Sequence, residues 1–349
     1  MQNTLRFARL LVVALLVNAF AHAQAKDDEP VDAVQGNWEG EWTLDSGDTG
    51  KLVVQVVAVG GGEYLGVFTG YDNSQQENQT YRLNIRGSTE KDQVVFSQTI
   101  PVGNIGTFTW KATVKEEAFV GTFTDNDDHV GKLNLKRIIT RPMALGTKPP
   151  SGAVVLFDGE KEGEKLDRWE NAASWEVVDG ALRPRAGDAA PKKHLINREK
   201  FRSTMMHLEY RTPFLPDAKG QERGQSGLIL HGKYEIQIVD SFGLEPSNVG
   251  AAALFEDTAP SKNVALPPGE WQVLDVTFKA PKTSDDGTVL EPGELSVLHN
   301  DVLVLDRIKV RSPTIGAPFA KALADVPGFV LENAKQAVEF RNIWMVNID

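Results

Sequence analysis

The sequence predicts an all-β fold: a two-sheet jelly-roll sandwich preceded by a smaller antiparallel β-barrel or sandwich. Short runs of alternating apolar and polar residues recur through most of the chain. Clusters of Gly, Asn and Asp separate these runs at the spacing typical of hairpins. Only two short segments, Asn197–Arg202 and Pro318–Ala324, resemble helical turns. A helical or α/β fold is therefore excluded.

Residues 1–25 have the pattern of a secretory signal peptide. A basic start precedes an apolar core at Leu10–Ala19 and the small-residue cleavage motif Ala21-His22-Ala23. The apolar run is too short to span a bilayer, and no other stretch approaches the required length. We expect cleavage near Ala23 or Ala25, a periplasmic or secreted protein, and no membrane insertion.

Acidic residues outnumber basic ones, 48 against 37, and the formal net charge is −11. Because the chain also has no basic block, nucleic acid and anionic membrane surfaces are not expected as partners. A neutral carbohydrate is compatible with this charge. The chain has no cysteine, so an exported form must be held together by its core without disulfides. The sequence does not indicate an oligomeric state.

Residues 31–140 are predicted to form a small all-β domain, whose role the sequence does not indicate. Gly40-Glu41-Trp42-Thr43 followed by Gly50-Lys51-Leu52 recurs, 81 positions later, as Gly121-Thr122-Phe123-Thr124 followed by Gly131-Lys132-Leu133. The segment from Leu65 to Gly70 is a third, partial copy. This repetition predicts an antiparallel meander that reuses one strand–turn–strand unit. The acidic loops 45–48 and 125–128 are interpreted as turns, since they lack the ordered oxygen spacing of a Ca²⁺ loop.

Residues 141–152 are a linker by composition, rich in Pro and Gly. The second domain, residues 153–349, contains about ten runs with strand alternation and hairpin spacing. The expected strands are Val154–Phe157, Trp175–Val178, His207–Arg211, Leu228–Leu230, Tyr234–Val239, Ala251–Phe255, Trp271–Ala280, Leu295–Leu298, Val302–Val310 and Val338–Val346.

The segment Gly224–Asp240 is the most informative stretch for function. Its alternation predicts a half-buried strand with Glu235 and Gln237 on the polar face. His231 lies at a break between two strand segments, where a turn or bulge can redirect a side chain. Asp240 has the other parity, and local twist at the strand end would be needed to bring it to the same cleft. The competing interpretation is an ordinary solvated strand face.

Two other strands carry ionisable residues on one face. His207, Glu209 and Arg211 alternate with apolar residues, and Arg341 shares its polar parity with Glu339. If these strands neighbour the first, one concave sheet would present carboxylates, an imidazole and a guanidinium to a ligand. Cross-strand ion pairs on a solvated face explain the pattern equally well. The sequence at His299-Asn300-Asp301 is interpreted as a hairpin turn.

Familiar catalytic motifs do not occur. The sequence has no Gly-x-Ser-x-Gly elbow, no cysteine nucleophile and no glycine-rich phosphate loop. No two His stand at metal-ligand spacing. We therefore expect no cofactor, although a divalent metal acting as a Lewis acid is compatible with the sequence.

Residues 153–346 resemble the 3-keto-disaccharide hydrolase family, also described as the 3-keto-glucoside 1,2-lyase/3-keto-2-hydroxy-glucal hydratase domain. The matching blocks follow one another in order across the whole second domain. They are Val155–Gly159, Trp175–Leu182, His207–Arg211, Gln225–Gly227, Tyr234–Ser241, Gly269–Trp271, Phe278–Pro281, Leu298–Asn300 and Phe340–Trp344. The resemblance implies a concanavalin-like jelly roll and does not extend to the first domain.

The resemblance implies cleavage of 3-keto-glucosides or 3-keto-disaccharides by elimination across C1–C2, followed by hydration. A base, an acid and a group that stabilises the enolate are needed. Glu235 and Asp240 are the leading acid–base candidates, with His231 beside them, and Gln237, Glu209, Arg211 and Arg341 are the candidates for substrate binding. Two alternatives stay open: a non-catalytic carbohydrate-binding sandwich, and a two-carboxylate glycosidase acting on unoxidised sugars.

This chain departs from the family pattern at three places. The family has Asn where Gln225 stands, and Asn-Gly where Asn300-Asp301 stands. A Gln-Asp-His-Gly stretch ahead of the last strand is replaced by Glu332-Asn333-Ala334. Catalysis is expected to be weakened if the missing Asp or His takes part in it.

Overall fold

The computed structural model describes residues 31–71, 79–103, 106–159, 166–185, 193–197, 199–284, 288–314, 328–334 and 336–348. The predicted signal peptide and the segment Pro318–Ala324 lie outside these residues. The described chain consists of β-strands with two single-turn 3₁₀ helices, Ala172–Ser174 and Gly220–Glu222, so the predicted all-β fold is confirmed. None of its helices has the length and apolar character of a membrane span.

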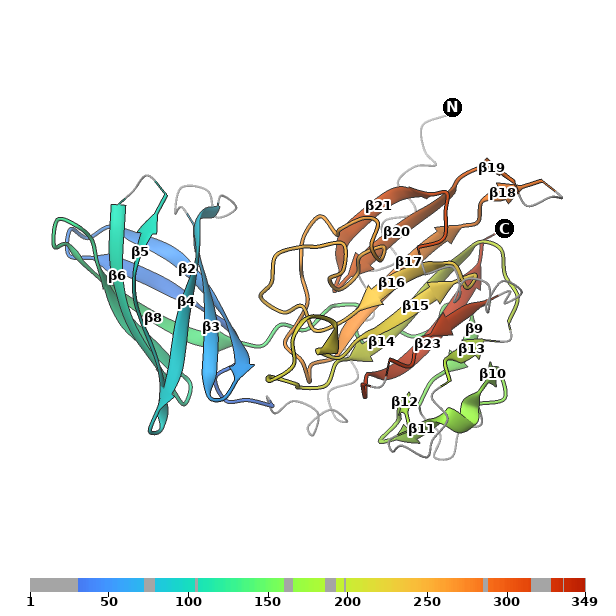
Figure 1. The fold of residues 1–349 in the computed structure, drawn as a ribbon, viewed down its shortest axis with the longest axis horizontal. Coiled ribbons are helices and arrows are strands. Elements are labelled where there is room, and N and C mark those ends of the chain that lie inside the picture. Colours follow the sequence, from blue (N-terminus) through green and yellow to red (C-terminus); the bar gives the residue numbers. More distant parts are fainter. Residues whose placement is uncertain are drawn as a thin grey trace, which may run out of the picture. The chain divides into compact units, whose positions relative to one another are not determined.

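Residues 36–138 form a closed antiparallel barrel in which each strand pairs with its neighbours in sequence and β1 pairs with β8 (Figure 1). Of the predicted alternatives, barrel or sandwich, the structure therefore has the barrel. The strands are β1 (Gly36–Leu44), β2 (Thr49–Gly60), β3 (Glu63–Tyr71), β4 (Gln79–Glu90), β5 (Gln93–Val102), β6 (Gly106–Lys115), β7 (Ala118–Thr124) and β8 (Val130–Ile138).

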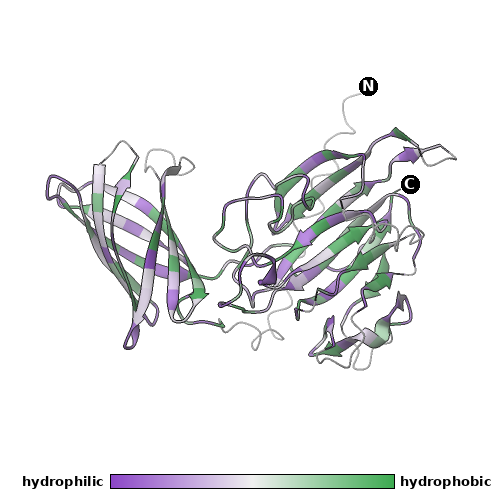
Figure 2. Ribbon diagram, viewed as in Figure 1, coloured by the Kyte–Doolittle hydropathy of each residue, from purple (hydrophilic) through white to green (hydrophobic). Residues whose placement is uncertain are grey.

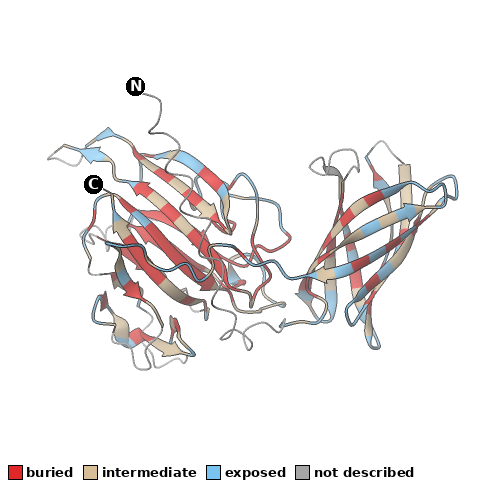
Figure 3. Cartoon of the chain, turned by 180° about the vertical axis from the view of Figure 1, so that it is seen from behind, coloured by how far each residue is buried: buried red, intermediate tan, exposed pale blue. Residues whose placement is uncertain are grey.

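Buried and exposed residues alternate along the barrel strands, as a sheet with one face on a core requires (Figure 3). The repeated sequence unit corresponds to the hairpins β1–β2 and β7–β8, which lie side by side because β1 pairs with β8. The first and last hairpins thus close the barrel with similar sequences.

The sandwich is built from two antiparallel sheets. The larger sheet has the strand order β11 (Trp175–Val178), β12 (Ala181–Pro184), β23 (Glu339–Asn347), β14 (Thr204–Arg211), β17 (Gln272–Lys279), β20 (Gly293–His299) and β21 (Val302–Val310), with β9 (Val154–Phe157) also paired to β23. The smaller sheet has the order β10 (Trp169–Glu170), β13 (Leu195–Asn197), β22 (Phe329–Leu331), β15 (Ser226–Leu230) and β16 (Tyr234–Ile238). A separate ribbon joins β18 (Lys282–Thr283) to β19 (Val289–Glu291).

One hydrophobic core lies between the two sheets. Leu208 and Tyr210 of β14 contribute to it from the larger sheet, and Ile236 and Ile238 of β16 from the smaller one. Hydrophobic residues concentrate in these central strands (Figure 2). Side chains of the opposite parity therefore point to the outer face of each sheet, and these two outer faces carry the residues of functional interest.

Two local predictions are wrong. Ala251–Phe255 is not a strand but an irregular segment that makes one isolated bridge, between Leu254 and Ile236. No helical turn occurs within the described part of Asn197–Arg202, where Asn197 ends β13. Asn300 and Asp301 do form the predicted hairpin turn, and both have positive φ (49° and 68°), as the right-handed twist of the flanking strands favours.

Candidate functional site

The structure divides the predicted site residues between two sheets. Glu235 and Gln237 lie on the outer side of the smaller sheet, because Tyr234, Ile236 and Ile238 of the same strand point into the core. Glu209, Arg211 and Arg341 lie on the outer side of the larger sheet. The sandwich core separates these sets, so the expected single concave face holding all of them does not form.

Glu332 joins Glu235 and Gln237 on the smaller sheet. Its backbone N–H donates to the Gly227 carbonyl (2.9 Å), and Gly227 in turn pairs with Gln237 across β15 and β16. Glu332 and Gln237 therefore flank Gly227 on one side of the sheet. We call the set Glu235, Gln237, Glu332, Gly227 and His194 the carboxylate face.

Gly227 leaves room for the Glu235 carboxylate. A Cβ atom at position 227 would lie 2.6 Å from Glu235 Oε1, closer than any real contact. Since Gly227 has ordinary strand backbone within β15, the space for the carboxylate explains the glycine better than turn geometry does. The first site residue missed by sequence reasoning is thus a glycine that lies beneath a carboxylate.

The carboxylates of this face have raised pKa values. Burial, and then the negative charges of Glu332 and Glu256, raise the pKa of Glu235 to about 8. Burial also raises the pKa of Glu332 above its ordinary value. Glu235 is only 5% exposed and Gln237 is fully buried, so the half-buried, solvated strand expected from alternation is covered on both faces. Glu235 is therefore protonated at neutral pH.

Gln237 positions the protonated carboxyl group. Gln237 Nε2 donates to Gln221 Oε1. With the amide group swapped, the nitrogen donates instead to Glu235 Oε1 (3.0 Å) and to the Ser226 carbonyl (3.0 Å). In that orientation Gln237 holds one oxygen of Glu235, which occupies the space that Gly227 leaves.

His194 lies at the edge of the carboxylate face, on the residue before β13. Because Leu195 pairs with Leu331, the antiparallel register brings His194 beside Glu332. The Asn333 N–H donates to His194 Nδ1 (3.0 Å), so the neutral ring carries its proton on Nε2. Burial lowers the pKa of His194, which keeps it neutral near pH 7. Sequence reasoning missed His194, because nothing near it in sequence suggested a site.

The other two catalytic candidates have different surroundings. Asp240 is buried and forms an ion pair with Arg223 (Nη2 to Oδ2, 2.5 Å) while accepting the Phe242 N–H. His231 has positive φ (50°) at the turn before β16, and its Nε2 lies 3.1 Å from the Phe201 carbonyl. These contacts favour a structural role, with Asp240 positioning the segment after β16 and His231 the turn before it. A direct catalytic role for either residue stays a prediction.

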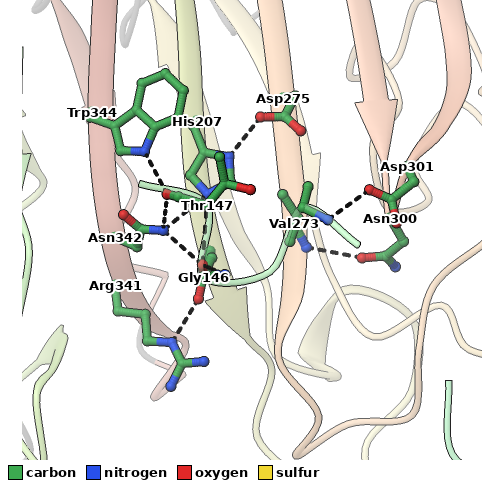
Figure 4. A network of polar contacts seen from close by, with 12 residues as sticks. Gly146, Thr147, His207, Val273, Asp275, Asn300, Asp301, Arg341, Asn342 and Trp344 are labelled. Carbon is green, nitrogen blue, oxygen red and sulfur yellow. Dashed lines mark hydrogen bonds and ion pairs between the residues drawn. The ribbon is translucent and has the colours of Figure 1, made fainter. Parts of the chain in front are cut away.

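On the larger sheet, the second set of residues is covered by the protein itself. Residues 143–147, called the strap below, belong to the predicted linker and run across the outer side of β14 and β23 (Figure 4). The Gly146 N–H donates to Glu209 Oε1 (2.6 Å), and the Thr147 carbonyl accepts from Asn342 Nδ2 (3.0 Å). Asp301 accepts the Met143 and Ala144 N–H groups (2.5 and 3.0 Å).

A satisfied charge network lies beneath the strap. Glu209 accepts from Arg341 Nε (2.7 Å) and Asn342 Nδ2 (2.8 Å), and His207 Nδ1 lies 2.7 Å from Asp275. We call His207, Glu209, Arg341, Asn342 and Trp344 the anchor face. Arg211 lies next to the anchor face and forms an ion pair with Glu339 (2.5 Å). The Arg211 guanidinium carbon lies 4.7 Å from the centroid of the Trp271 ring, and that of Arg341 lies 4.0 Å from it.

Titration on the anchor face is opposite to that on the carboxylate face. Burial opposes the charged forms, but hydrogen bonds and charges from Asp275 and Glu209 outweigh it and raise the pKa of His207 to about 9. Burial likewise opposes ionisation of Glu209, but hydrogen bonds from His207, Asn342 and Arg341 lower its pKa to about 2. Both groups are charged and paired at neutral pH.

Trp344 corrects one further expectation. Simple alternation places it on the same face as Phe340, in the core, yet its ring stacks on His207 with centroids 4.9 Å apart. Asn342 has positive φ (46°), and the register between β14 and β23 shifts at this point. The bulge moves Trp344 to the outer face.

Within the described residues, no three His, Asp or Glu side chains come together as a metal site. The carboxylate face instead offers an acid, a second carboxylate, an amide and an imidazole N–H. Such a set can donate one proton, accept another and stabilise a developing oxyanion.

Two crystal structures from Parabacteroides distasonis ATCC 8503, both of proteins provisionally named glycosyl hydrolases, resemble this chain. One is 29% identical over 57% of this chain and 85% of its own, with a TM-score of 0.49. The other is 14% identical over 57% of this chain and 95% of its own, with a TM-score of 0.39. No curated protein sequence matches significantly.

The sequence of the second domain matches a family of carbohydrate-processing domains. The sequence profile of the 3-keto-alpha-glucoside-1,2-lyase-like domain matches residues 152–346, more than half of the chain. The chain therefore belongs to this family, and the resemblance seen in the sequence is confirmed.

Proposed function

We propose that the protein is an exported enzyme that cleaves 3-keto-glucosides by β-elimination and then hydrates the product, for a net hydrolysis. The observation that carries the proposal is the arrangement of Glu235, Gln237 and Glu332 around Gly227 on one side of the smaller sheet. Burial and the neighbouring negative charge raise the pKa of Glu235 to about 8. Of two neighbouring carboxyl groups, one that holds its proton can act as the acid and the other as the base in one reaction.

The elimination step needs both carboxyl groups. A ketone at C3 makes the C2 proton acidic, and we assign its removal to the Glu332 carboxylate. The C2–H electron pair forms the C1–C2 double bond as the C1–oxygen bond breaks, and the protonated Glu235 gives its proton to the departing oxygen. The negative charge that develops on the C3 oxygen is assigned to the His194 Nε2–H as donor.

Hydration then restores the enzyme. Glu235, now ionised, removes a proton from water, whose oxygen adds to C1, and the protonated Glu332 returns a proton to C2. Gln237 holds Glu235 Oε1 through both half-reactions. The replacement of the family's Gln by Glu332 supplies a carboxylate where the family's Asp and His are missing, which supports an active enzyme rather than a degenerate one.

The decisive test compares a 3-keto-glucoside with its unoxidised parent, following release of the aglycone by the purified protein. We expect cleavage of the keto form alone, because only that form has an acidic C2 proton. In deuterated water the sugar product should carry deuterium at C2, because the proton that Glu332 has taken up exchanges with solvent before it is returned. Cleavage of both substrates would instead indicate a two-carboxylate glycosidase, and sugar binding without cleavage would indicate a carbohydrate-binding domain.

Export is part of the proposal and rests on residues 1–25, which match a signal peptide. Expression of the full chain in a bacterium, followed by fractionation and N-terminal sequencing, tests it. A periplasmic or secreted protein that begins near residue 24 or 26 supports export. A cytoplasmic protein that retains Met1 contradicts it.

A further inference from the structure

The barrel is packed at one end and hollow at the other. Trp38, Phe68, Phe96 and Phe119 fill the end where β1, β5 and β7 begin, with ring centroids 5.6 to 6.1 Å apart. A cavity of about 300 Å³ lies at the opposite end of the barrel, where β1, β5 and β7 finish. The strands of the barrel are drawn in Figure 1. The lining of the cavity consists of Trp42, Leu44, Tyr81, Val102, Phe108, Trp110, Phe123 and Asp125.

The repeated sequence unit builds the wall of this cavity. Three of the lining rings lie over a glycine directly across the neighbouring strand, so that a Cβ at each glycine would lie 2.1 to 2.4 Å from the ring. The pairs are Trp42 with Gly50, Phe123 with Gly131, and Tyr81 with Gly70. Each ring is thereby held flat against the barrel wall instead of filling the interior. Gly50 and Gly131 occupy the same position in two copies of the repeated unit, and together with Gly70 they keep the cavity open.

Two hydrogen-bond donors in the cavity wall lack partners. Trp42 Nε1 and Trp110 Nε1 are buried and have no hydrogen bond among the described residues. Trp38, by contrast, donates its indole N–H to the Val34 carbonyl (2.9 Å). A buried donor without an acceptor is unfavourable, and so is an unfilled apolar cavity of this size. Both features fit a ligand that brings an acceptor.

The charges at this end of the barrel restrict the ligand further. The turns that border it, residues 45–48 after β1 and 125–128 after β7, carry Asp45, Asp48, Asp125, Asp127 and Asp128. The Asp125 pKa is lowered by its hydrogen bond from His129, which keeps the carboxylate ionised. An anionic ligand such as a fatty acid is therefore disfavoured. A simple cation is also disfavoured, because it brings no acceptor for the two indole N–H groups.

We infer that the barrel is a binding module for a small, neutral, planar aromatic molecule that carries a hydrogen-bond acceptor. The five aromatic residues of the lining offer ring faces and edges, and the two free indole N–H groups offer the polar contacts. At the packing density of protein interiors, the cavity holds roughly 10–15 non-hydrogen atoms, the size of one or two fused rings. An eight-stranded barrel is wide enough for one such ligand. This inference does not depend on the function proposed for the sandwich.

Titration calorimetry with the full mature chain tests the inference using three probes of equal ring size. Coumarin is neutral and has a carbonyl acceptor, naphthalene lacks the acceptor, and 2-naphthoate adds a negative charge. We expect coumarin to bind with a micromolar dissociation constant, and the other two at least about fivefold more weakly, the worth of one hydrogen bond. The double variant Trp42→Phe, Trp110→Phe should lose the preference for coumarin while it still binds naphthalene.

Two further variants locate the site and serve as controls. Leu44→Trp places a larger side chain at the cavity and should weaken all three probes at least tenfold. Trp38→Phe makes the same change as the double variant at a ring whose N–H is already paired, and should leave coumarin binding unchanged. Folding of each variant is checked by its thermal unfolding curve. Equal affinities for coumarin and naphthalene, binding that survives Leu44→Trp, or no binding of any probe would overturn the inference.

Discussion

The two outer faces of the sandwich carry similar sequence patterns and opposite electrostatics. On the anchor face, opposite charges meet: His207 is held between Asp275 and Glu209, and Arg341 neutralises Glu209. On the carboxylate face, like charges meet, and the pKa of Glu235 rises to about 8. The protein covers the anchor face with its own strap. Paired charges are typical of a structural contact, whereas crowded carboxylates are tolerated where they serve chemistry.

The largest expected effect is on enzymatic turnover, and it should distinguish the carboxylate face from the anchor face. Glu235→Gln removes the acid that protonates the leaving group, and we expect turnover of a 3-keto-glucoside to fall by about 10²–10⁴-fold. Stability should hold or rise, because the amide is close in shape to a protonated carboxyl and removes the cost of keeping Glu235 protonated above its ordinary pKa. Steady-state kinetics and thermal unfolding of the same sample measure both effects.

Glu209→Gln is the matched control on the anchor face. It removes the carboxylate that pairs with Arg341 and one of the two carboxylates beside His207, which keeps Asp275. Because a buried ion pair is broken, we expect a loss of about 3–5 kcal/mol in the free energy of unfolding. Turnover per folded molecule should change little. If Glu209→Gln abolished turnover in folded protein while Glu235→Gln preserved it, the catalytic site would lie on the anchor face and the carboxylate face would be structural.

Glu332→Gln tests the assignment of the base. The amide cannot accept the C2 proton, so turnover should fall by a similar ~10²–10⁴-fold. The pKa of Glu235 should also fall toward its ordinary value, since one of the charges that raises it is removed. NMR titration of the Glu235 carboxyl carbon in both proteins measures this shift. An unchanged Glu235 pKa would show that the two carboxyl groups do not interact.

The fold was readable from the sequence because alternation and turn residues are local signals. The positions of Glu235, Gln237 and Glu209 on outer faces followed from parity alone. Whether these outer faces belong to one sheet or to two did not follow from the sequence, because the sheet that a strand joins depends on long-range packing. The bulge at Asn342, which moves Trp344, and the return of the strap over Glu209 leave no local sequence signal. His194 and Glu332 meet only through the pairing of β13 with β22.

The pH dependence of the free energy of unfolding should also distinguish the anchor face from the carboxylate face. His207 has a folded pKa near 9, above its ordinary value of 6.5, so its stabilising effect is complete below pH 6.5 and is lost as pH rises through 9. Glu209 has a folded pKa near 2, below 4.5, so its effect is present above pH 4.5 and is lost as pH falls through 2.

Glu235 contributes a further pH dependence to the free energy of unfolding. Its folded pKa is raised, so stability declines from pH 4.5 and levels off above about 8. We expect Glu235→Gln to remove the decline between pH 5 and 8, and His207→Gln to remove the decline between pH 7 and 9. Chemical denaturation at four pH values across these windows measures both. A wild-type curve that stayed flat from pH 5 to 9 would contradict both pKa assignments.

The smallest effect concerns the strap. Asp301→Ala removes the acceptor of the Met143 and Ala144 N–H groups, while the Gly146 and Thr147 contacts to the anchor face remain. We expect a loss of about 1–2 kcal/mol in the free energy of unfolding, the usual cost of hydrogen bonds to a charged group at a partly exposed position. Faster amide hydrogen exchange at residues 143–147 should accompany it, with turnover unchanged.

Asp306→Ala is the matched control. Asp306 lies on β21, the strand that follows the turn. Among the contacts of the described chain, it pairs only with the exposed Arg307 next to it. Turnover that fell with Asp301→Ala but not with Asp306→Ala would mean that the strap, and with it the anchor face, contributes to catalysis after all.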